Sequence, residues 1–387
     1  MANQRKRAAE KAARAAEKAA KKHPKLFLLL VIVVLVIALV AGAYWYFFVY
    51  KKESPTPSPS PSPTPTPSPS VGTLKTGELG IHFLELGNKY TGDCIYIQIG
   101  SVDILIDGGS RAGSAATIAN YVNQYCTDGI LEYVIVTHAD QDHIAAFAAT
   151  NGLFRRFECK TIIDFPRTGK NTQVYQNYVK ERDAEVEAGA THYTALQCWN
   201  QTDGAKRSYE LAEGVTMNFL YNYYYEHDTN DENNYSVCMY IKQGEYNYLF
   251  TGDLEEDGER RLIENNELPQ CKLFKAGHHG SKTSSTEALL SVIKPECVCV
   301  CCCAGSNEYN AKPENTFPTQ AMISRVMKYT QNIYVTSLAD ESLPSGYTSM
   351  NGNIVVKSDG VDFSVTGSAN STLLKDTAWF KENRVWN

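Results

Sequence analysis

Residues 138–143 read His-Ala-Asp-Gln-Asp-His and follow directly on the apolar run Val134-Ile135-Val136. Two imidazoles and two carboxylates at the end of an expected strand converge on one small volume, and their nitrogen and oxygen atoms are suited to binding divalent metals. A solvated polar loop is the alternative, but two further sets of candidate ligands downstream argue against it. The motif therefore predicts a dinuclear metal site with an open edge for water and substrate.

The two downstream sets also stand at the ends of expected strands. Asp253 follows an apolar segment and a glycine, so its carboxylate is placed to bridge two metals or, alternatively, to cap the helix expected directly after it. The histidine pair at 278–279 lies between two glycines and is followed by Ser281 and Lys282. This pattern suits a metal ligand beside an anion-binding turn.

The elements that must hold these residues alternate between strand-like and helix-like segments from residue 77 onward. Their order favours two sheets with flanking helices, while the segment 172–230, rich in Tyr and polar residues, is left unassigned. We expect strands at 81–86, 94–99, 102–106, 133–136, 215–221, 236–242, 246–250, from 273 and at 297–303, and helices at 114–126, 254–266, 286–294 and near 318–330.

Five of the eleven cysteines fall within the apolar run 297–303. Cysteine packs well as a small hydrophobic side chain, so we interpret this run as a buried strand. A thiolate metal cluster is the alternative, but it needs a loop geometry that a strand does not offer. Because the count is odd, at least one cysteine of a lone chain is unpaired.

The charge is distributed unevenly along the chain. Residues 1–53 carry eleven Lys/Arg and three Asp/Glu, so with a total of −6 the remaining chain has a net charge of −14. An acidic body does not attract polyanions through its long-range field. We therefore expect no stable nucleic-acid partner.

The first seventy residues predict a membrane anchor and a spacer. Residues 26–50 are uncharged and long enough to cross a bilayer, and nine Lys/Arg precede them while Lys51 and Lys52 follow. This imbalance predicts a cytoplasmic N-terminus and an extracytoplasmic C-terminal portion. A signal peptide cleaved after residues 41–43 is the alternative.

We divide the chain accordingly into a basic cytoplasmic segment (1–25), a transmembrane helix (26–50), a Pro/Ser/Thr-rich linker (51–76), a catalytic domain (77–370) and a C-terminal tail (371–387). In the linker, proline stands at every second position of residues 54–70. Such a tract favours extended polyproline II, a semi-rigid spacer.

The motifs in combination resemble the metallo-β-lactamase-like domain of the ComEC competence-protein family over about residues 77–365. The pieces that carry the resemblance are 81–87, Gly92-Asp93-Cys94, 104–109, 137–143, 234–237, Thr251-Gly252-Asp253, 278–281, 353–356 and 358–360.

The resemblance implies an α/β fold, the αββα metallo-β-lactamase sandwich, with two divalent metal ions, Zn²⁺ or Mn²⁺, at the sheet edge. His278 rather than His279 takes the ligand role, and Asp107 braces the site. The implied metal ligands or close neighbours are His138, Asp140, Asp142, His143, Asp253 and His278; the supporting residues are Asp107, Asn234 and His279; the catalytic residues are Asp142, which orients the nucleophile, and Ser281 and Lys282, which bind a substrate oxygen.

Three features depart from the family pattern. Asp140 stands where many members of the wider superfamily have His, although the ComEC-like branch also uses Asp. Oxygen in place of nitrogen makes the site harder and leaves Mn²⁺ as plausible as Zn²⁺. The separate histidine that usually follows the first motif has no clear counterpart, since His192 and His227 lie in unpatterned stretches. The usual His-Pro after the last core strand is Lys312-Pro313, and the multi-helix channel of the family is missing.

These observations predict a membrane-anchored, extracytoplasmic phosphodiesterase or nuclease-like hydrolase that uses a metal-activated hydroxide. The diester would belong to a cell-wall polymer, a nucleotide or DNA. A lactamase or lactonase, which needs an apolar pocket near the metals, is the second enzyme reading. A catalytically silent metal-binding surface module is the third.

Overall fold

The computed structural model describes residue 74 and residues 77–386 apart from residue 311. The predicted basic segment, membrane span and nearly all of the linker lie outside these residues. Among the described residues, no helix has the length and apolar character needed to cross a bilayer. The membrane anchor therefore stays a prediction.

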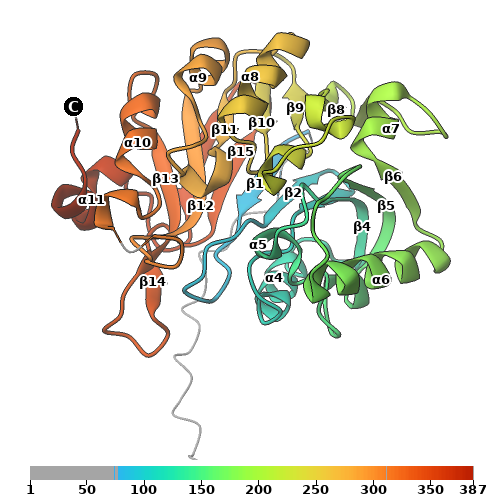
Figure 1. Cartoon of the computed structure of the whole chain (residues 1–387), viewed down its shortest axis with the longest axis horizontal. Coiled ribbons are helices and arrows are strands. Elements are labelled where there is room, and N and C mark those ends of the chain that lie inside the picture. The colour runs from blue at the N-terminus through green and yellow to red at the C-terminus, as the bar shows by residue number, and fades with distance from the viewer. Residues whose placement is uncertain (1–73, 75–76, 311, 387) are drawn as a thin grey trace, which may run out of the picture. The chain divides into compact units, whose positions relative to one another are not determined.

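Two eight-stranded sheets form the body of the described unit (Figure 1). The first has the order β16 (Phe363–Gly367), β15 (Ile354–Ser358), β1 (Leu79–Phe83), β2 (Ile95–Ile99), β3 (Val102–Ile106), β4 (Ile130–Ile135), β5 (Glu158–Asp164) and β6 (Thr191–Thr194). The second has the order β14 (Tyr347–Ser349), β13 (Ile333–Ala339), β12 (Cys297–Ala304), β11 (Leu273–Lys275), β10 (Tyr246–Phe250), β9 (Met239–Gln243), β8 (Val215–Phe219) and β7 (Ser208–Ala212).

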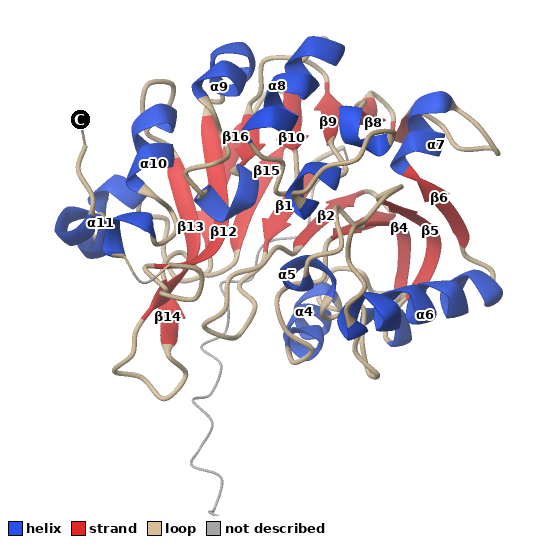
Figure 2. Ribbon diagram, viewed as in Figure 1, coloured by secondary structure: helices blue, strands red, loops and turns tan. Residues whose placement is uncertain are grey.

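Helices flank both sheets (Figure 2). Beside the first sheet are α4 (Ser114–Val122), α5 (Gln141–Ile144) and α6 (Gln173–Glu187), with α7 (Ala195–Asn200) after β6. Beside the second are α8 (Glu256–Asn265), α9 (Glu287–Ile293) and α10 (Gln320–Val326). The expected strands and helices are confirmed with shifted ends, β8 being the strand expected at 215–221. The elements that were not expected include α6, α7, β5, β6, β7 and β13 to β16.

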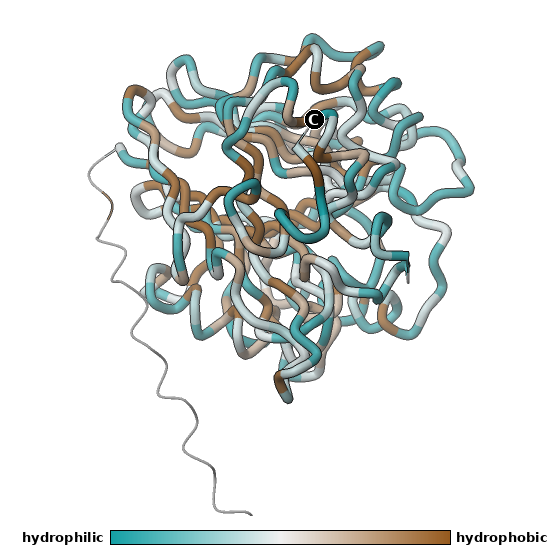
Figure 3. Tube along the Cα trace, turned by 90° about the vertical axis from the view of Figure 1, so that its left-hand side faces the viewer, coloured by the Kyte–Doolittle hydropathy of each residue, from teal (hydrophilic) through white to brown (hydrophobic). Residues whose placement is uncertain are grey.

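The core lies between the sheets and beneath the helices, and hydrophobic positions follow the inner segments of the trace (Figure 3). Strand β12 shows the division clearly. Cys297, Cys299 and Cys301 join the core that also contains side chains of the first sheet, whereas Val298 and Val300 pack with the residues of α9 and α10. All the cysteines are buried free thiols, so the interpretation of the run as a packed strand is confirmed.

The final residues, separated above as a C-terminal tail, contain the short helix α11 (Ala378–Asn383). Leu374 and Phe380 are buried in the core on the outer face of the second sheet. This segment therefore contributes side chains to the core of the domain.

Candidate metal centre

Parallel strands bring the motifs to one edge of each sheet. In the first sheet, β3 and β4 pair in parallel, with Ile106 opposite Ile135. In the second, β10 and β11 pair in parallel, with Tyr248 opposite Leu273. Because the carboxyl ends of parallel neighbours share an edge, the residues that follow β3, β4, β10 and β11 gather there.

Asp107, the first residue after β3, braces the metal-binding motif. Its carboxylate accepts hydrogen bonds of 2.8 Å from the backbone N–H and from the hydroxyl of Thr137, and its Oδ2 lies 2.8 Å from Nδ1 of His143. The backbone at Asp107 has a left-handed φ of 60°. This conformation is uncommon outside glycine and is tolerated best by residues such as aspartate.

Donor atoms of Asp93, His143, Asp253 and His279 lie within 4.8 Å of one another at the meeting point of the two sheets, and Asp142 lies beside them. Nε2 of His143 lies 3.1 Å from Oδ2 of Asp253, and Nε2 of His279 lies 3.0 Å from the same oxygen. Oδ2 of Asp142 lies 3.3 Å from Nε2 of His279. These separations are close to the edge of about 3.3 Å that a tetrahedral site with bonds of about 2.0–2.1 Å requires.

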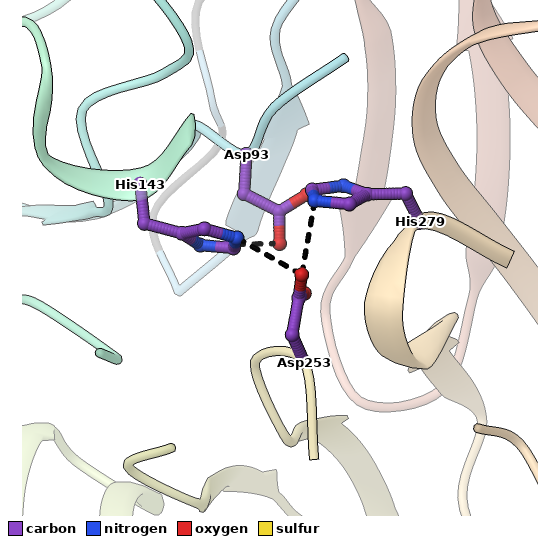
Figure 4. Close-up of side chains that lie close together, drawn as sticks. All are labelled: Asp93, His143, Asp253 and His279. Atoms are coloured by element: carbon purple, nitrogen blue, oxygen red, sulfur yellow. Dashed lines mark hydrogen bonds and ion pairs between the residues drawn. The ribbon is translucent and has the colours of Figure 1, made fainter. Parts of the chain in front are cut away.

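Figure 4 shows His143 and His279 facing Asp253, with Asp93 beside them. Partners of the outer ring nitrogens orient both imidazoles. When Nδ1–H of His143 donates to Asp107 and Nδ1–H of His279 donates to the carbonyl of Cys301, 3.0 Å away, both Nε2 lone pairs face Asp253. A carboxylate or a carbonyl that holds the second ring nitrogen is the usual support of a metal-binding histidine.

Buried atoms without hydrogen-bond partners test whether a metal fits here. Nε2 of His279 and Nε2 of His138 are buried and have no such partner. An imidazole lone pair that faces carboxylate oxygens at about 3 Å is repulsive unless a cation lies between them. A divalent ion satisfies this arrangement, so the residues fit the metal that the motif predicts.

Although burial lowers it, Asp253 and Asp107 raise the pKa of His143 well above its usual range, and Asp253 and Asp93 do the same for His279. The carboxylates thus attract positive charge to these two ring nitrogens, and a metal that binds there would have to replace the protons.

Burial and the neighbouring His143 lower the pKa of His138 well below its usual range, which keeps it neutral as a ligand must be. Burial alone would raise the pKa of the Asp253 carboxyl, but His279, His143 and Lys275 hold it well below its usual range. Asp253 is therefore ionised, and it is not a helix cap, because α8 has Glu255 at its N-cap.

The structure places the two histidines of the pair in different surroundings. His279, given only a supporting role from the sequence, is fully buried among the donor atoms, whereas His278 has 20% of its side chain exposed and points its Nδ1 to Glu255, 2.7 Å away. Both residues have left-handed backbone, with φ of 43° and 52°. Two successive left-handed residues turn the second imidazole inward. Metal binding by either residue stays a prediction.

His138 and Asp140 lie beside this group rather than within it. Nε2 of His138 is 3.7 Å from Oδ2 of Asp140. Asp140 is only half-buried and forms an ion pair with Lys170, which lies in the loop before α6. The two histidines considered as further ligands are bound elsewhere, since His192 lies 2.8 Å from Asp164 and His227 stacks on Tyr223.

The other residues predicted for catalysis and support are not in the cluster. The hydroxyl of Ser281 pairs with that of Thr283 at 2.8 Å. Lys282 is exposed and does not line the cavity beside the donor atoms. Asn234 accepts a 3.3 Å hydrogen bond from the backbone N–H of Glu255, so it supports the segment that follows Asp253.

Two buried residues of the site were not predicted from the sequence. Lys275, at the end of β11, lies 3.2 Å from Oδ1 of Asp253 and 3.0 Å from the carbonyl of Gly252, and it contacts Asp93. Asp93 lies 3.1 Å from Nδ1 of His279. A lysine at the end of an apolar strand is a signal that could have identified Lys275, because an unpaired lysine is almost never fully buried.

A cavity of about 410 Å³ opens beside the donor atoms. The hydroxyl of Tyr309 donates to Oδ2 of Asp142 over 2.6 Å at its wall. Nearly all its walls are polar or charged; the lining residues are Arg111, Asp140, Gln141, Asp142, Asn233, Asp253, His278, Glu308 and Tyr309. The cavity is suited to a polar substrate.

Glu259 of α8 holds the loop that follows the histidine pair. It accepts hydrogen bonds of 2.6 and 2.8 Å from the backbone N–H groups of Ser285 and Thr286, and one of 2.6 Å from the Thr286 hydroxyl. Burial raises the pKa of Glu259 from 4.5 to about 7. Between pH 4.5 and about 7, Glu259 keeps its proton in the folded state but loses it in the unfolded state. The contribution of Glu259 to the unfolding free energy therefore falls as the pH rises.

Glu259→Gln removes this titration. Between pH 4.5 and 7, we therefore expect the unfolding free energy of the natural protein to fall by about 3 kcal/mol relative to that of the variant. One pKa unit corresponds to about 1.4 kcal/mol. Urea unfolding followed by tryptophan fluorescence across this range measures the difference. Parallel pH profiles for the two proteins would contradict the prediction.

Comparisons with known proteins agree with the motifs and the topology. Residues 227–304 match the family model of the metallo-beta-lactamase superfamily, a range that contains Asp253 and both histidines of the pair. The chain is 26% identical over 172 residues to ComE operon protein 3 of Bacillus subtilis. The aligned stretch covers 43% of this chain and 19% of that protein. It is 25% identical over 243 residues to Recombination protein 2 of Haemophilus influenzae, with 62% of this chain and 25% of that protein covered.

The chain thus spans about a fifth to a quarter of the length of these two relatives. Among solved structures, the metallo-beta-lactamase fold protein YhfI from Bacillus subtilis aligns over 68% of this chain and 97% of its own at 12% identity and a TM-score of 0.40. Together, the family model, the competence-protein relatives and the two-sheet topology show that this chain has a metallo-β-lactamase-like fold and is homologous to the competence proteins, as its motifs predict.

Proposed function

We propose that this chain is a metal-dependent hydrolase that cleaves a phosphodiester. The observation that carries the proposal is the convergence of Nε2 of His143, Nε2 of His279 and Oδ2 of Asp253, with Asp142 beside His279, at an open polar cavity. A divalent ion, Zn²⁺ or Mn²⁺, bound by such donors lowers the pKa of water toward neutrality and stabilises the charge that develops on the substrate.

The side chains of the cavity have separate tasks in this proposal. Asp142, fixed by the Tyr309 hydroxyl 2.6 Å away, orients the attacking water. Arg111 also lines the cavity and is held by Glu308 at 2.7 Å, so we assign its guanidinium to a non-bridging phosphate oxygen. This role replaces the one that the sequence suggested for Ser281 and Lys282.

The cavity favours a phosphodiester over a lactam or lactone. A lactamase or lactonase needs apolar walls beside the metal, and Tyr309 is the one mainly hydrophobic side chain among the residues that line this cavity. Because the chain beyond residue 53 has a net charge of −14, the substrate in this proposal is a cell-wall polymer or a small nucleotide in preference to duplex DNA.

Turnover of two chromogenic substrates tests the proposal. With added Mn²⁺ or Zn²⁺, the full chain in detergent should hydrolyse bis-p-nitrophenyl phosphate and leave nitrocefin intact. Hydrolysis of nitrocefin alone would favour the lactamase reading. Bound metal without turnover of either substrate would favour a catalytically silent surface module.

We also propose that residues 26–50 anchor the protein in the cell membrane as a single span, with the N-terminus in the cytoplasm and the catalytic domain outside it. The excess of Lys/Arg before the span supports this orientation. Protease added to intact cells should then remove the portion from residue 71 onward and spare the basic N-terminus. Protection of the C-terminal portion would place the hydrolase in the cytosol.

A further inference from the structure

A second metal would need the other carboxylate oxygen of Asp253 as a bridging ligand, but that oxygen already pairs with a lysine. Oδ2 of Asp253 faces the two histidines, but its Oδ1 lies 3.2 Å from the ammonium of Lys275. This ammonium also donates to the carbonyl of Gly252 over 3.0 Å and contacts Asp93, and its side chain is 1% exposed. Three acceptors surround an ammonium that has three hydrogens to donate, so Lys275 is fully satisfied where it lies.

Asp140, the other carboxylate that a second metal would need, is also paired with a lysine. Asp140, 3.7 Å from Nε2 of His138, forms an ion pair with Lys170. The loop that carries Lys170 is held in place, because the Lys170 backbone N–H donates to the Thr168 hydroxyl over 2.9 Å. Thr168 in turn donates to Glu232. Asp140 lines the cavity, and the loop that carries Lys170 holds the ammonium against it.

Few donors remain for an ion beside His138. Among the described residues, the groups of three or more His, Cys, Asp or Glu with mutually close donor atoms are Asp93, His143, Asp253 and His279 at this site and a separate group around Asp103. His138 and Asp140 do not form such a group with a third residue. His192 and His227 are engaged elsewhere.

We propose that this centre binds a single divalent ion, next to His143, Asp253 and His279, and that the ammonium groups of Lys170 and Lys275 compensate the charge where a second ion would otherwise bind. The inference rests on the metal centre of the proposed function but not on its substrate. It revises the expectation of two ions drawn from the sequence.

The physical reason is charge balance in a buried site. Carboxylates removed from water need positive partners, and two lysines supply them without any metal. A second dication would have to displace the ammonium of Lys170 from Asp140 and to share Asp253 with that of Lys275. Removing Lys170 should therefore free the Asp140 carboxylate, beside His138, to bind a second ion together with water.

Metal stoichiometry of the full chain in detergent tests this inference. After saturation with Mn²⁺ and removal of free metal by gel filtration, mass spectrometry of the metal content should give one ion per chain. The electron paramagnetic resonance spectrum should show isolated Mn²⁺ without the multiline pattern of a spin-coupled pair. Two ions per chain, a coupled pair, or no bound ion would overturn the proposal.

Two variants test the role of the lysine. The side chain of Lys170 is 34% exposed, so the variant Lys170→Met should fold. At saturation it should bind more than one Mn²⁺ per chain, approaching two. Lys180→Met removes an exposed lysine of α6 and should stay at one. An unchanged stoichiometry in Lys170→Met would refute the compensation by Lys170.

The outcomes separate this inference from the proposed function. One bound ion without hydrolysis of bis-p-nitrophenyl phosphate would reject the substrate but leave the single-ion centre standing. Two bound ions with full hydrolysis would reject the single-ion centre but support the phosphodiester substrate.

Discussion

Asp253→Asn is expected to remove the bound metal and to lower the rate of phosphodiester hydrolysis by at least two orders of magnitude. Oδ2 of Asp253 lies 3.1 Å from Nε2 of His143 and 3.0 Å from Nε2 of His279, so it is the atom that the other donors share. An amide oxygen carries no net charge and cannot balance a dication in a buried site. Without the ion, both the activation of water and the stabilisation of the developing charge are lost.

The measurement pairs metal content with the rate of bis-p-nitrophenyl phosphate hydrolysis, and circular dichroism verifies that the variant is folded. Asp183→Asn is a matched control, because Asp183 is exposed on α6 and pairs with Arg182 at 2.8 Å. The control should keep full metal and full activity. A folded Asp253→Asn protein that also kept both would refute the location of the centre.

The two adjacent histidines are expected to respond very differently to substitution. His279→Ala should lose the metal and at least a hundredfold in rate, because the imidazole is fully buried and its Nε2 lies 3.3 Å from Asp142 and 3.0 Å from Asp253. His278→Ala should keep the metal and lose less than tenfold in rate. Its Nδ1 is bound to Glu255 at 2.7 Å, and its ring lies at the rim of the cavity.

Metal content measured for both variants under identical dialysis decides between them. His192→Ala is the matched control, since His192 pairs with Asp164 at 2.8 Å on β6, and it should retain its metal. Thermal unfolding of His279→Ala separates metal loss from loss of the fold. Loss of metal in His278→Ala, with metal retained in His279→Ala, would restore the assignment made from the sequence.

Nine of the sixteen described strands, and the polar residues at the ends of β4 and β10, were predictable from the sequence because both signals are local. Apolar runs mark β4 and β10, and the polar residues that follow them, 138–143 and Asp253, stand within a few positions of the strand ends. Parallel pairing then brings such ends together without further information. Burial of the cysteine-rich strand β12 follows from the same periodicity.

The composition of the inner site depended on the tertiary structure. Asp93 and Lys275 are 182 positions apart in sequence and meet across the two sheets, and Lys170 reaches Asp140 from a loop that lies outside every strand and helix. The choice of His279 over His278 depends on two successive left-handed residues, which turn one imidazole inward and the other to the rim. Sequence patterns report which face of a strand or helix is buried, whereas long-range contacts and the backbone path of a loop are set only when the whole chain has packed.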